Sequence, residues 1–240
     1  MDVQEATTCR LPDLKERHLP ENCRETINTI LKETYGYEQF RNLEIYDDLS
    51  KGKEKLCISQ GQLIENVILE VEKAWKGETQ VDNILLTAPT GSGKSLLFQL
   101  PAIYLGKEYN LLTIVVSPLK ALIVDQVESL QELGYTRVAY ASSDLSPEQK
   151  MEVYRQVREG EIDLFYLSPE LLLSYDIKHF VGERRIGLVV VDEAHTVTTW
   201  GKEFRVDYWF LGRYLTALKQ TLGYNFPLFA LTATAVWNPK

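Results

Sequence analysis

The sequence predicts a doubly wound α/β domain with a mostly parallel sheet, preceded by a helical extension. After residue 83, short apolar runs alternate with amphipathic segments of helical period. Runs that are apolar on both faces and are separated by helices are typical of parallel strands buried between two helix layers. A glycine-rich turn follows the first run, and two adjacent acids follow a later one. We therefore assign residues 59–240 to the α/β domain and residues 1–58 to the extension.

Polar residues that follow the strands are expected to gather at one edge of the sheet, because parallel strands joined by right-handed crossovers end there. Apolar residues recur at helical spacing between most strands, which predicts helices over 94–105, 119–133, 147–159 and about 207–222. The expected strands are Ile84–Leu86, Leu111–Val116, Arg137–Ala141, Ile162–Leu167, Ile186–Val191 and Leu228–Leu231.

The chain before the first strand is expected to be helical. Residues 1–20 form a lead-in with two prolines, and helices are expected over 21–33 and 38–49. A third helix, over 61–75, carries an apolar face, and Gly77 ends it. The acidic extension is interpreted as a docking segment or as a solvated cap.

Composition indicates an ordinary globular domain, with 240 residues, 45% of them hydrophobic and 25% charged. No apolar run reaches the ~18 residues of a membrane span, and the N-terminus lacks a signal-peptide pattern. Three widely spaced cysteines suit a reducing cytosol and indicate neither a disulfide framework nor a zinc site. We therefore expect a cytoplasmic protein, nucleoid-associated in a bacterium, without membrane or zinc. The net charge of −8 excludes an extended basic surface, so any nucleic-acid contact must be local.

Residues 87–95, with the sequence TAPTGSGKS, have the pattern of a phosphate-binding loop. Backbone N–H groups and the positive end of the following helix would face the phosphates. Lys94 would reach the β- and γ-phosphates of a nucleotide, and the Ser95 hydroxyl would ligate Mg²⁺. Ala88 stands where the strict pattern has glycine, and the alternative is an ordinary strand-to-helix turn. The expected nucleotide-binding residues are Thr90, Gly91, Ser92, Gly93, Lys94 and Ser95.

Two adjacent acids, Asp192 and Glu193, follow the apolar run 186–191. A buried strand would deliver them to the sheet edge that carries the phosphate loop. There Asp192 would hold Mg²⁺ through its water shell, and Glu193 would orient and deprotonate the attacking water. The alternative is a solvated strand end, but the combination with a phosphate loop favours the catalytic interpretation.

Three segments together resemble superfamily 2 helicases: TAPTGSGKS at 87–95 (motif I), DEAH at 192–195 (motif II) and LTATA at 231–235 (motif III). The segment WGKEFRVDY at 200–208 is similar to the aromatic-rich loop that follows DEAH in RecQ-type DNA helicases. Further RecQ-like segments lie at 98–102, 116–122, 125–127 and 166–170. The resemblance covers about residues 60–236.

The resemblance implies the first RecA-like motor lobe of an ATP-dependent DNA helicase, a P-loop NTPase that uses ATP and Mg²⁺. Its partner would be single-stranded or duplex DNA. A second motor lobe in the same longer polypeptide would supply an arginine, without which the first lobe would hydrolyse ATP weakly. Within motifs II and III, His195, Thr232 and Thr234 would couple the nucleotide site to the DNA site.

Segments that follow other strands are expected to contact nucleic acid. Hydroxyls and backbone N–H groups at strand ends can bind phosphates without adding positive charge, which suits an acidic chain. Aromatic side chains of the loop at 200–208 could stack on unpaired bases beside an arginine, the alternative being a core position. The expected residues are Ser117, Pro118, Ser168, Pro169, Trp200, Phe204 and Arg205.

In the resembled family, a glutamine that precedes a helix reads adenine. This glutamine follows an aromatic residue, an arginine and two further residues. Phe40-Arg41 begins such a pattern, but Glu44 stands where the glutamine belongs. Gln60 and Gln62 both lie at the start of the predicted helix over 61–75. Gln62 is the favoured reader, because the apolar helical residues follow it directly, and Gln60 is the second choice. An arginine is missing from their local pattern.

Two other functions stay open. One is an RNA helicase or remodelling translocase with the same fold, against which the aromatic-rich loop argues. The other is a nucleotide-dependent nucleic-acid-binding module of a defence or repair complex, against which the complete set of catalytic residues argues.

Overall fold

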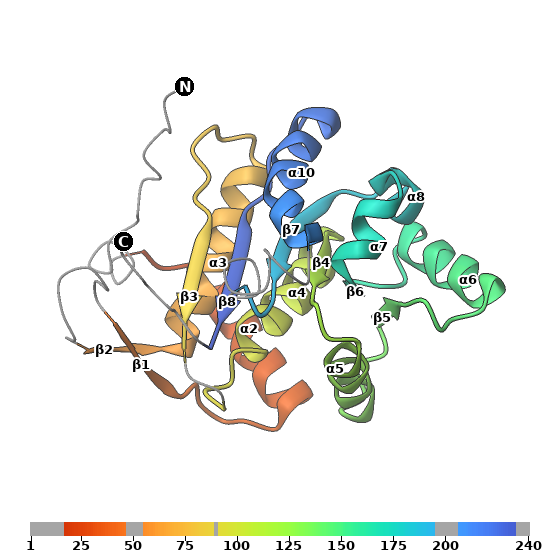
Figure 1. The fold of residues 1–240 in the computed structure, drawn as a ribbon. Helices are drawn as coiled ribbons and strands as arrows, with labels where there is room; N and C mark the ends of the chain where they lie inside the picture. Colours follow the sequence, from red (N-terminus) through yellow and green to blue (C-terminus); the bar gives the residue numbers. More distant parts are fainter. Residues whose placement is uncertain (1–16, 47–54, 89–90, 195–205, 234–240) are drawn as a thin grey trace.

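The computed structural model describes residues 17–46, 55–88, 91–194 and 206–233 (Figure 1). Its centre is a six-stranded sheet with the strand order β3-β8-β7-β4-β6-β5. All neighbouring strands are parallel, which confirms the predicted sheet. The strands are Ile84–Thr87 (β3), Leu112–Val116 (β4), Val138–Ala141 (β5), Leu164–Leu167 (β6), Ile186–Val191 (β7) and Leu228–Thr232 (β8).

Helices precede the sheet and connect its strands. They are Glu21–Tyr35 (α2), Gln60–Trp75 (α3), Leu96–Tyr109 (α4), Lys120–Glu132 (α5), Pro147–Arg158 (α6), Pro169–Ser174 (α7), Ile177–Val181 (α8) and Val206–Leu222 (α10). The sequence does not predict α7 and α8, because helices of six and five residues are too short to show a helical period. No helix in the described ranges is both long and apolar enough to cross a membrane.

Alternate residues of the central strands face two separate hydrophobic clusters. Val115 of β4 and Val190 of β7 belong to a cluster that includes residues of α2, α3, α4 and α5. Their neighbours Ile114 and Val189 belong to a second cluster with residues of α6, α7, α8 and α10. Burial on both faces explains why these strands appear in the sequence as continuous apolar runs.

The N-terminal segment shares the core of the α/β domain. Helix α2 ends at Gly36, whose φ of 69° is the left-handed conformation that glycine adopts without strain. The buried side chains of Ile27, Ile30 and Leu31 pack in the same cluster as residues of α3 and α4. The extension from residue 17 onward is therefore packed against the lobe.

The helix predicted over 38–49 is wrong, because this segment contributes a strand. Strand β1 (Asn42–Tyr46) pairs antiparallel with β2 (Lys55–Ser59) in a separate two-stranded sheet. Leu43 lies opposite Ile58, and both side chains are buried in the first cluster. Cross-strand packing outweighs the weak local helix propensity of this short segment.

Candidate active site

The phosphate loop and the acid pair meet because β8 lies between β3 and β7 (Figure 1). The backbone N–H of Ala88, just before the loop, donates to the carbonyl of Thr232 at 3.1 Å. On the other side of β8, the N–H of Ala194 donates to the carbonyl of Leu231 at 2.8 Å. The end of β8 thus contacts both halves of the site, and Thr232, a predicted coupling residue, stands between them.

The described part of the predicted phosphate loop contains two glycines in the left-handed conformation. Gly91 and Gly93 have φ values of 79° and 78°, in the left-handed region that favours glycine. A Cβ on Gly91 would meet open space, whereas one on Gly93 would lie 2.7 Å from Nε2 of Gln60. Within the described ranges, the buried Oγ of Ser92 has no hydrogen-bond partner. The loop therefore offers an unused polar group beside exposed glycines.

Lys94 and Ser95 connect the loop to α4. Nζ of Lys94 donates to the carbonyl of Ala88 at 2.9 Å, so its ammonium lies across the base of the loop. Ser95 has helical backbone angles, and its side chain is half-exposed at the first turn of α4. Thr90, another predicted nucleotide-binding residue, lies outside the described residues.

Asp192 is buried at the end of β7 and is held by three contacts. Its N–H donates to the carbonyl of Val116 at 2.9 Å. Its Oδ1 accepts from the N–H of Glu193 at 2.9 Å, and its Oδ2 accepts from Nε2 of Gln126 at 3.4 Å. Burial, and then the negative charge of Glu193, raise the pKa of Asp192, while Lys94 has a smaller lowering effect. Lys94 and Asp192 thus belong to one electrostatic site.

Glu193 has a φ of 50°, a left-handed conformation that is uncommon for a residue other than glycine. Its side chain is half-buried, in contrast to that of Asp192. Such backbone conformations cost roughly 1–3 kcal/mol and are found at active sites, where the surrounding structure enforces them. His195, which is predicted to couple the nucleotide site to the DNA site, lies outside the described residues.

The hairpin of β1 and β2 brings Arg41 back to the start of α3. Asn42 pairs with Ser59, and the N–H of Gln60 donates to the carbonyl of Arg41 at 2.9 Å. The aromatic-arginine pair at 40–41 therefore directly adjoins Gln60 in space, although 18 residues separate Arg41 from Gln60 in the sequence. Arg41 contacts Gln60 through its backbone, whereas its guanidinium lies over the ring of Tyr37, 5.7 Å from the ring centroid.

Gln60 and Gln62 have different surroundings. The buried Gln60 side chain accepts from the N–H of Arg41 at 3.1 Å and donates to the carbonyl of Ser92 at 3.2 Å. Nε2 of Gln62 instead donates to the carbonyl of Arg17 at 3.0 Å. Gln62 and Phe40 line a cavity of about 300 Å³ between α2 and α3. The contact of Gln60 with the phosphate loop could not be read from the sequence.

The ends of β4 and β6, which precede the predicted nucleic-acid contacts, lie side by side. Ser117 and Pro118 are buried, whereas Leu119 and Lys120, which follow them, are exposed. The Ser168 hydroxyl accepts from the N–H of Leu171 at 3.3 Å and caps α7, where Pro169 is buried. Trp200, Phe204, Arg205 and Thr234 lie outside the described residues.

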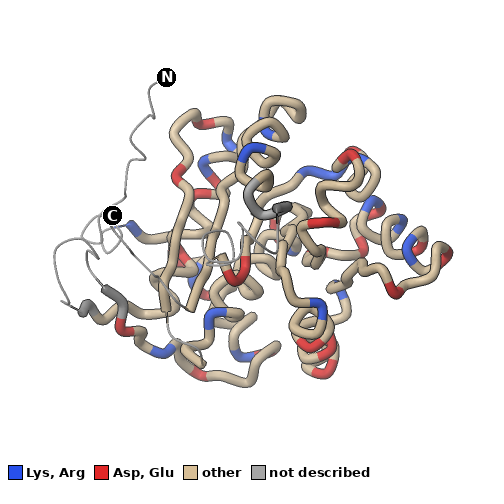
Figure 2. Tube along the Cα trace, in the orientation of Figure 1, with Lys and Arg blue, Asp and Glu red and all other residues tan. Residues whose placement is uncertain are grey.

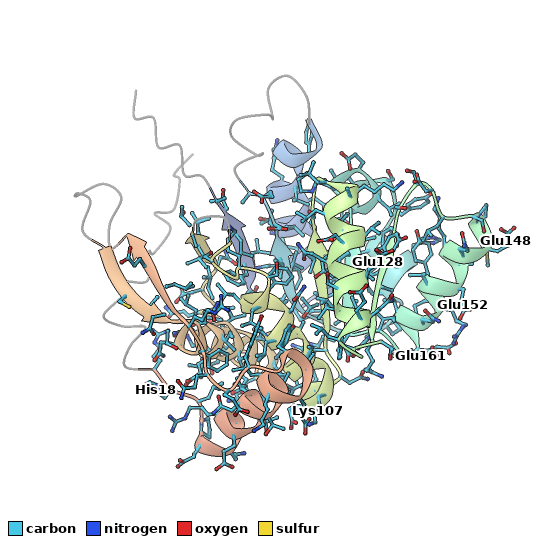
Figure 3. All side chains as sticks on the ribbon, turned by 90° about the horizontal axis from the view of Figure 1, so that it is seen from below. His18, Lys107, Glu128, Glu148, Glu152 and Glu161 are labelled. Carbon is cyan, nitrogen blue, oxygen red and sulfur yellow. The ribbon has the colours of Figure 1, made fainter. Side chains whose placement is uncertain are left out.

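Exposed acidic side chains lie along α5 and α6, where Figure 2 shows red segments. They include Glu128 on α5, Glu148 and Glu152 on α6, and Glu161 just beyond it (Figure 3). Arg155 pairs with Glu152 at 2.8 Å and with Glu161 at 2.9 Å, which neutralises only part of this charge. The acidic residues on α5 and α6 do not form one face, because α5 packs in the first hydrophobic cluster and α6 in the second.

The geometry of the site and the sheet agrees with a family assignment. A family model described as DEAD/DEAH box helicase matches residues 65–240. This chain belongs to the DEAD/DEAH box helicase family. The string DEAH occupies positions 192–195 of this chain, and its first residue, Asp192, directly follows β7.

Curated relatives within this family confirm the RecQ-like resemblance. The ATP-dependent DNA helicase RecQ of Synechocystis is 35% identical over 217 residues, which cover 88% of this chain and 38% of the relative. RecQ of Haemophilus influenzae is 31% identical over 210 residues, covering 88% and 28%. The probable ATP-dependent DNA helicase RecS of Bacillus subtilis is 40% identical over 147 residues, covering 61% and 27%. The chain therefore matches well under half the length of these relatives.

Solved helicase structures share the fold. The helicase MrfA, in a crystal structure with DNA and AMPPNP, gives a TM-score of 0.58 at 22% identity, covering 93% of this chain and 28% of that chain. A hypothetical ATP-dependent RNA helicase from Sulfolobus tokodaii gives 0.51 at 17% identity, covering 90% and 51%. At such low identity the likeness concerns the fold alone.

Proposed function

We propose that the chain is the ATP-binding motor lobe of a RecQ-like, ATP-dependent DNA helicase. The observation that carries this proposal is the position of β8, whose end contacts the residue before the phosphate loop on one side and the residue after the acid pair on the other. A nucleotide on the loop would lie beside Asp192 and Glu193, an arrangement suited to phosphoanhydride hydrolysis. The RecQ relatives support DNA as the polymer on which the motor acts.

ATP and Mg²⁺ fit the residues that are present. The loop has two left-handed glycines and an unpartnered buried Ser92 hydroxyl among the described residues, and Asp192 supplies a carboxylate at the same edge. Lys94 and the loop N–H groups would bind the phosphates, while Ser95 and Asp192 would hold Mg²⁺. When bound, Mg²⁺ would neutralise phosphate charge. Gln62, beside the cavity between α2 and α3, is the proposed adenine reader.

Glu193 is the proposed general base. Its half-buried carboxylate has access to water, from which it can accept a proton during attack. A glutamine at this position cannot accept that proton, so Glu193→Gln should keep nucleotide binding and lose turnover. Retained turnover would identify another base.

Single-stranded DNA is the proposed partner at the strand-end edge. The polar ends of β4 and β6, which lie side by side, support this location. We assign base stacking to Trp200 and Phe204, with Arg205 supplying charge. Stimulation of ATP hydrolysis by single-stranded DNA should exceed stimulation by RNA of the same sequence, and the reverse order would favour an RNA helicase.

A second motor lobe in the same polypeptide would complete the site, and the length of the relatives supports this. Its arginine could raise the hydrolysis rate by about 10³–10⁵-fold. His195, Thr232 and Thr234 would then couple hydrolysis to movement on DNA. We place this activity in the cytoplasm, or at the nucleoid of a bacterium.

Binding of a fluorescent ATP analogue tests the proposed function. Lys94→Ala should abolish binding, because it removes the charge that neutralises the β- and γ-phosphates. Lys107→Ala is the matched control, since this exposed lysine lies in the last turn of the same helix, α4 (Figure 3). Unchanged affinity in Lys94→Ala would refute the nucleotide site.

A further inference from the structure

A continuous line of hydrogen-bonded side chains crosses the interior from α2 to Asp192. Oη of Tyr35 donates to Oε1 of Gln99 at 3.4 Å, and Nε2 of Gln99 donates to the Tyr166 hydroxyl at 3.2 Å. The Tyr166 hydroxyl donates to Oε1 of Gln126 at 3.0 Å, and Nε2 of Gln126 donates to Oδ2 of Asp192 at 3.4 Å. These five side chains, here called the polar relay, come from α2, α4, β6, α5 and the end of β7.

The chemistry of Asp192 dictates the direction of the polar relay. An ionised carboxylate only accepts hydrogen bonds, so Gln126 must turn its NH₂ group toward Asp192 and its carbonyl oxygen toward Tyr166. The Tyr166 hydroxyl then donates to Gln126 and accepts from Gln99. Every donor therefore points along the line toward Asp192, and hydrogen bonds aligned in this way strengthen one another.

Four of the five members of the polar relay are buried, and Tyr35 is partly buried. Tyr166 is 0% exposed, and Gln99, Gln126 and Asp192 are 6%, 8% and 5% exposed. Loss of one buried member leaves the polar groups of its neighbours unsatisfied, which costs more than the bond itself contributes. The members consequently constrain one another, and a displacement of one is transmitted to the next.

The polar relay connects the proposed DNA-binding edge with the proposed Mg²⁺ ligand. Gln126 lies on α5, which begins directly after the strand end at 117–118. Tyr166 lies on β6, two residues before Ser168. Both neighbouring segments carry proposed DNA contacts, whereas Asp192 is the proposed Mg²⁺ ligand. A shift of α5 or β6 would therefore move the donor that holds Oδ2 of Asp192.

We propose that Gln126 and Tyr166 are positioning residues that orient the Asp192 carboxylate and transmit changes at the DNA-binding edge to it. This inference rests on the proposed function and deepens it. The backbone N–H of Glu193 holds Oδ1 of Asp192, so the polar relay fixes the second oxygen and with it the plane of the carboxylate. Supporting contacts of this kind orient a metal ligand without touching the metal.

Nucleotide affinity, measured with and without Mg²⁺ and with and without a single-stranded oligonucleotide, tests this role. Tyr166→Phe removes one hydroxyl but keeps the ring, and Gln126→Leu removes the amide. The gains in affinity from Mg²⁺ and from DNA should each fall by about 5- to 10-fold in either variant, as expected for a lost buried hydrogen bond. The double variant should lose no more than either single variant, because the two residues act through one line of contacts.

Two matched variants control for general effects of the substitutions. Tyr104→Phe removes a buried tyrosine hydroxyl outside the polar relay, and Gln131→Leu removes an exposed amide from the same helix as Gln126. Both should keep the full gain from Mg²⁺. Additive losses in the double variant, or an undiminished Mg²⁺ effect in both relay variants, would overturn the proposal. Equal losses with and without Mg²⁺ would show a purely structural role and would also overturn it.

The unaltered chain separates this inference from the proposed function. If it fails to bind Mg²⁺ and nucleotide at all, the proposed function itself is wrong. If the unaltered chain binds Mg²⁺ and nucleotide and the relay variants bind them equally well, only the proposed role of the polar relay is wrong.

Discussion

Gln60 and Ser92 are joined by a hydrogen bond of 3.2 Å from the side-chain amide of Gln60 to the carbonyl of Ser92. The oxygen of the same amide accepts from the N–H of Arg41 at 3.1 Å. Gln60 therefore braces the phosphate loop against the base of the β1–β2 hairpin. Gln62, two residues further along, contacts Arg17 and lines the cavity between α2 and α3 instead.

The two glutamines should respond differently to substitution. Gln60→Ala should weaken ATP and GTP analogues alike, by about 10-fold, because it loosens the loop that binds their common phosphates. Gln62→Ala should weaken ATP and leave GTP unaffected. Titration of fluorescent analogues of both nucleotides measures this, and a loss of ATP alone in Gln60→Ala would make Gln60 the adenine reader.

As the pH falls, binding of Mg²⁺ with nucleotide should weaken at a higher pH than it would if Asp192 had the pKa of an ordinary aspartate. Burial, followed by the charge of Glu193, raises the pKa of Asp192 above its usual value of 3.8. The carboxylate must be ionised to hold Mg²⁺, so binding is complete above the raised pKa and is lost as the pH falls through it. Glu193→Gln removes one cause and should shift the midpoint to lower pH.

A pH series of nucleotide affinity, recorded with and without Mg²⁺, checks this shift. The values without Mg²⁺ control for acid effects on the rest of the chain. A midpoint that stays in place or rises in Glu193→Gln would contradict the assigned cause.

Asp163→Ala should destabilise the chain by about 3–5 kcal/mol, because it leaves a buried arginine without its counter-charge. The Asp163 carboxylate is buried and accepts from Nε of Arg137 at 2.6 Å, from Nη2 of Arg184 at 2.9 Å and from the Tyr135 hydroxyl at 3.0 Å. The Arg184 side chain is only 4% exposed, and burial lowers its pKa. Urea denaturation measures the change in the free energy of unfolding.

Asp144→Ala is the control for this prediction. Asp144 pairs with Lys120 at the surface, where both side chains are exposed, and such pairs contribute about 1 kcal/mol or less. Equal losses in the two variants would show that Asp163 is no more important than a surface ion pair.

Gly106→Ala should also destabilise the chain, by about 1–3 kcal/mol, although alanine is the better helix former. A Cβ on Gly106 of α4 would overlap the carboxyl group of Asp163. Gly212 of α10 has open space around its Cβ position, so Gly212→Ala should stabilise the chain by about 0.5–1 kcal/mol. Thermal or urea denaturation should show that the free energy of unfolding falls in Gly106→Ala and rises in Gly212→Ala. A rise in both variants would show that helix propensity alone decides.

Most of the sheet could be predicted because each strand carries its own burial signal. The runs around Val115 and Val190 are apolar on both faces, and the sheet buries them on both faces. The strand at Asn42–Tyr46 could not be predicted, since its partner at Lys55–Ser59 decides its conformation. The same pairing places Arg41 against Gln60, a contact that sequence spacing conceals.

The sequence by itself determined the local chemistry: a glycine-rich loop with Lys94 and Ser95, and the pair Asp192 and Glu193. Only the tertiary structure decided how these groups meet and what supports them. The strand order sets β8 between β3 and β7, and the packing of α5 on the sheet brings Gln126 to Asp192. Local motifs depend on neighbouring residues, whereas these contacts join residues far apart in the sequence, 66 positions for Gln126 and Asp192 and more for the pairing of β3 with β8, and exist only once the sheet has assembled.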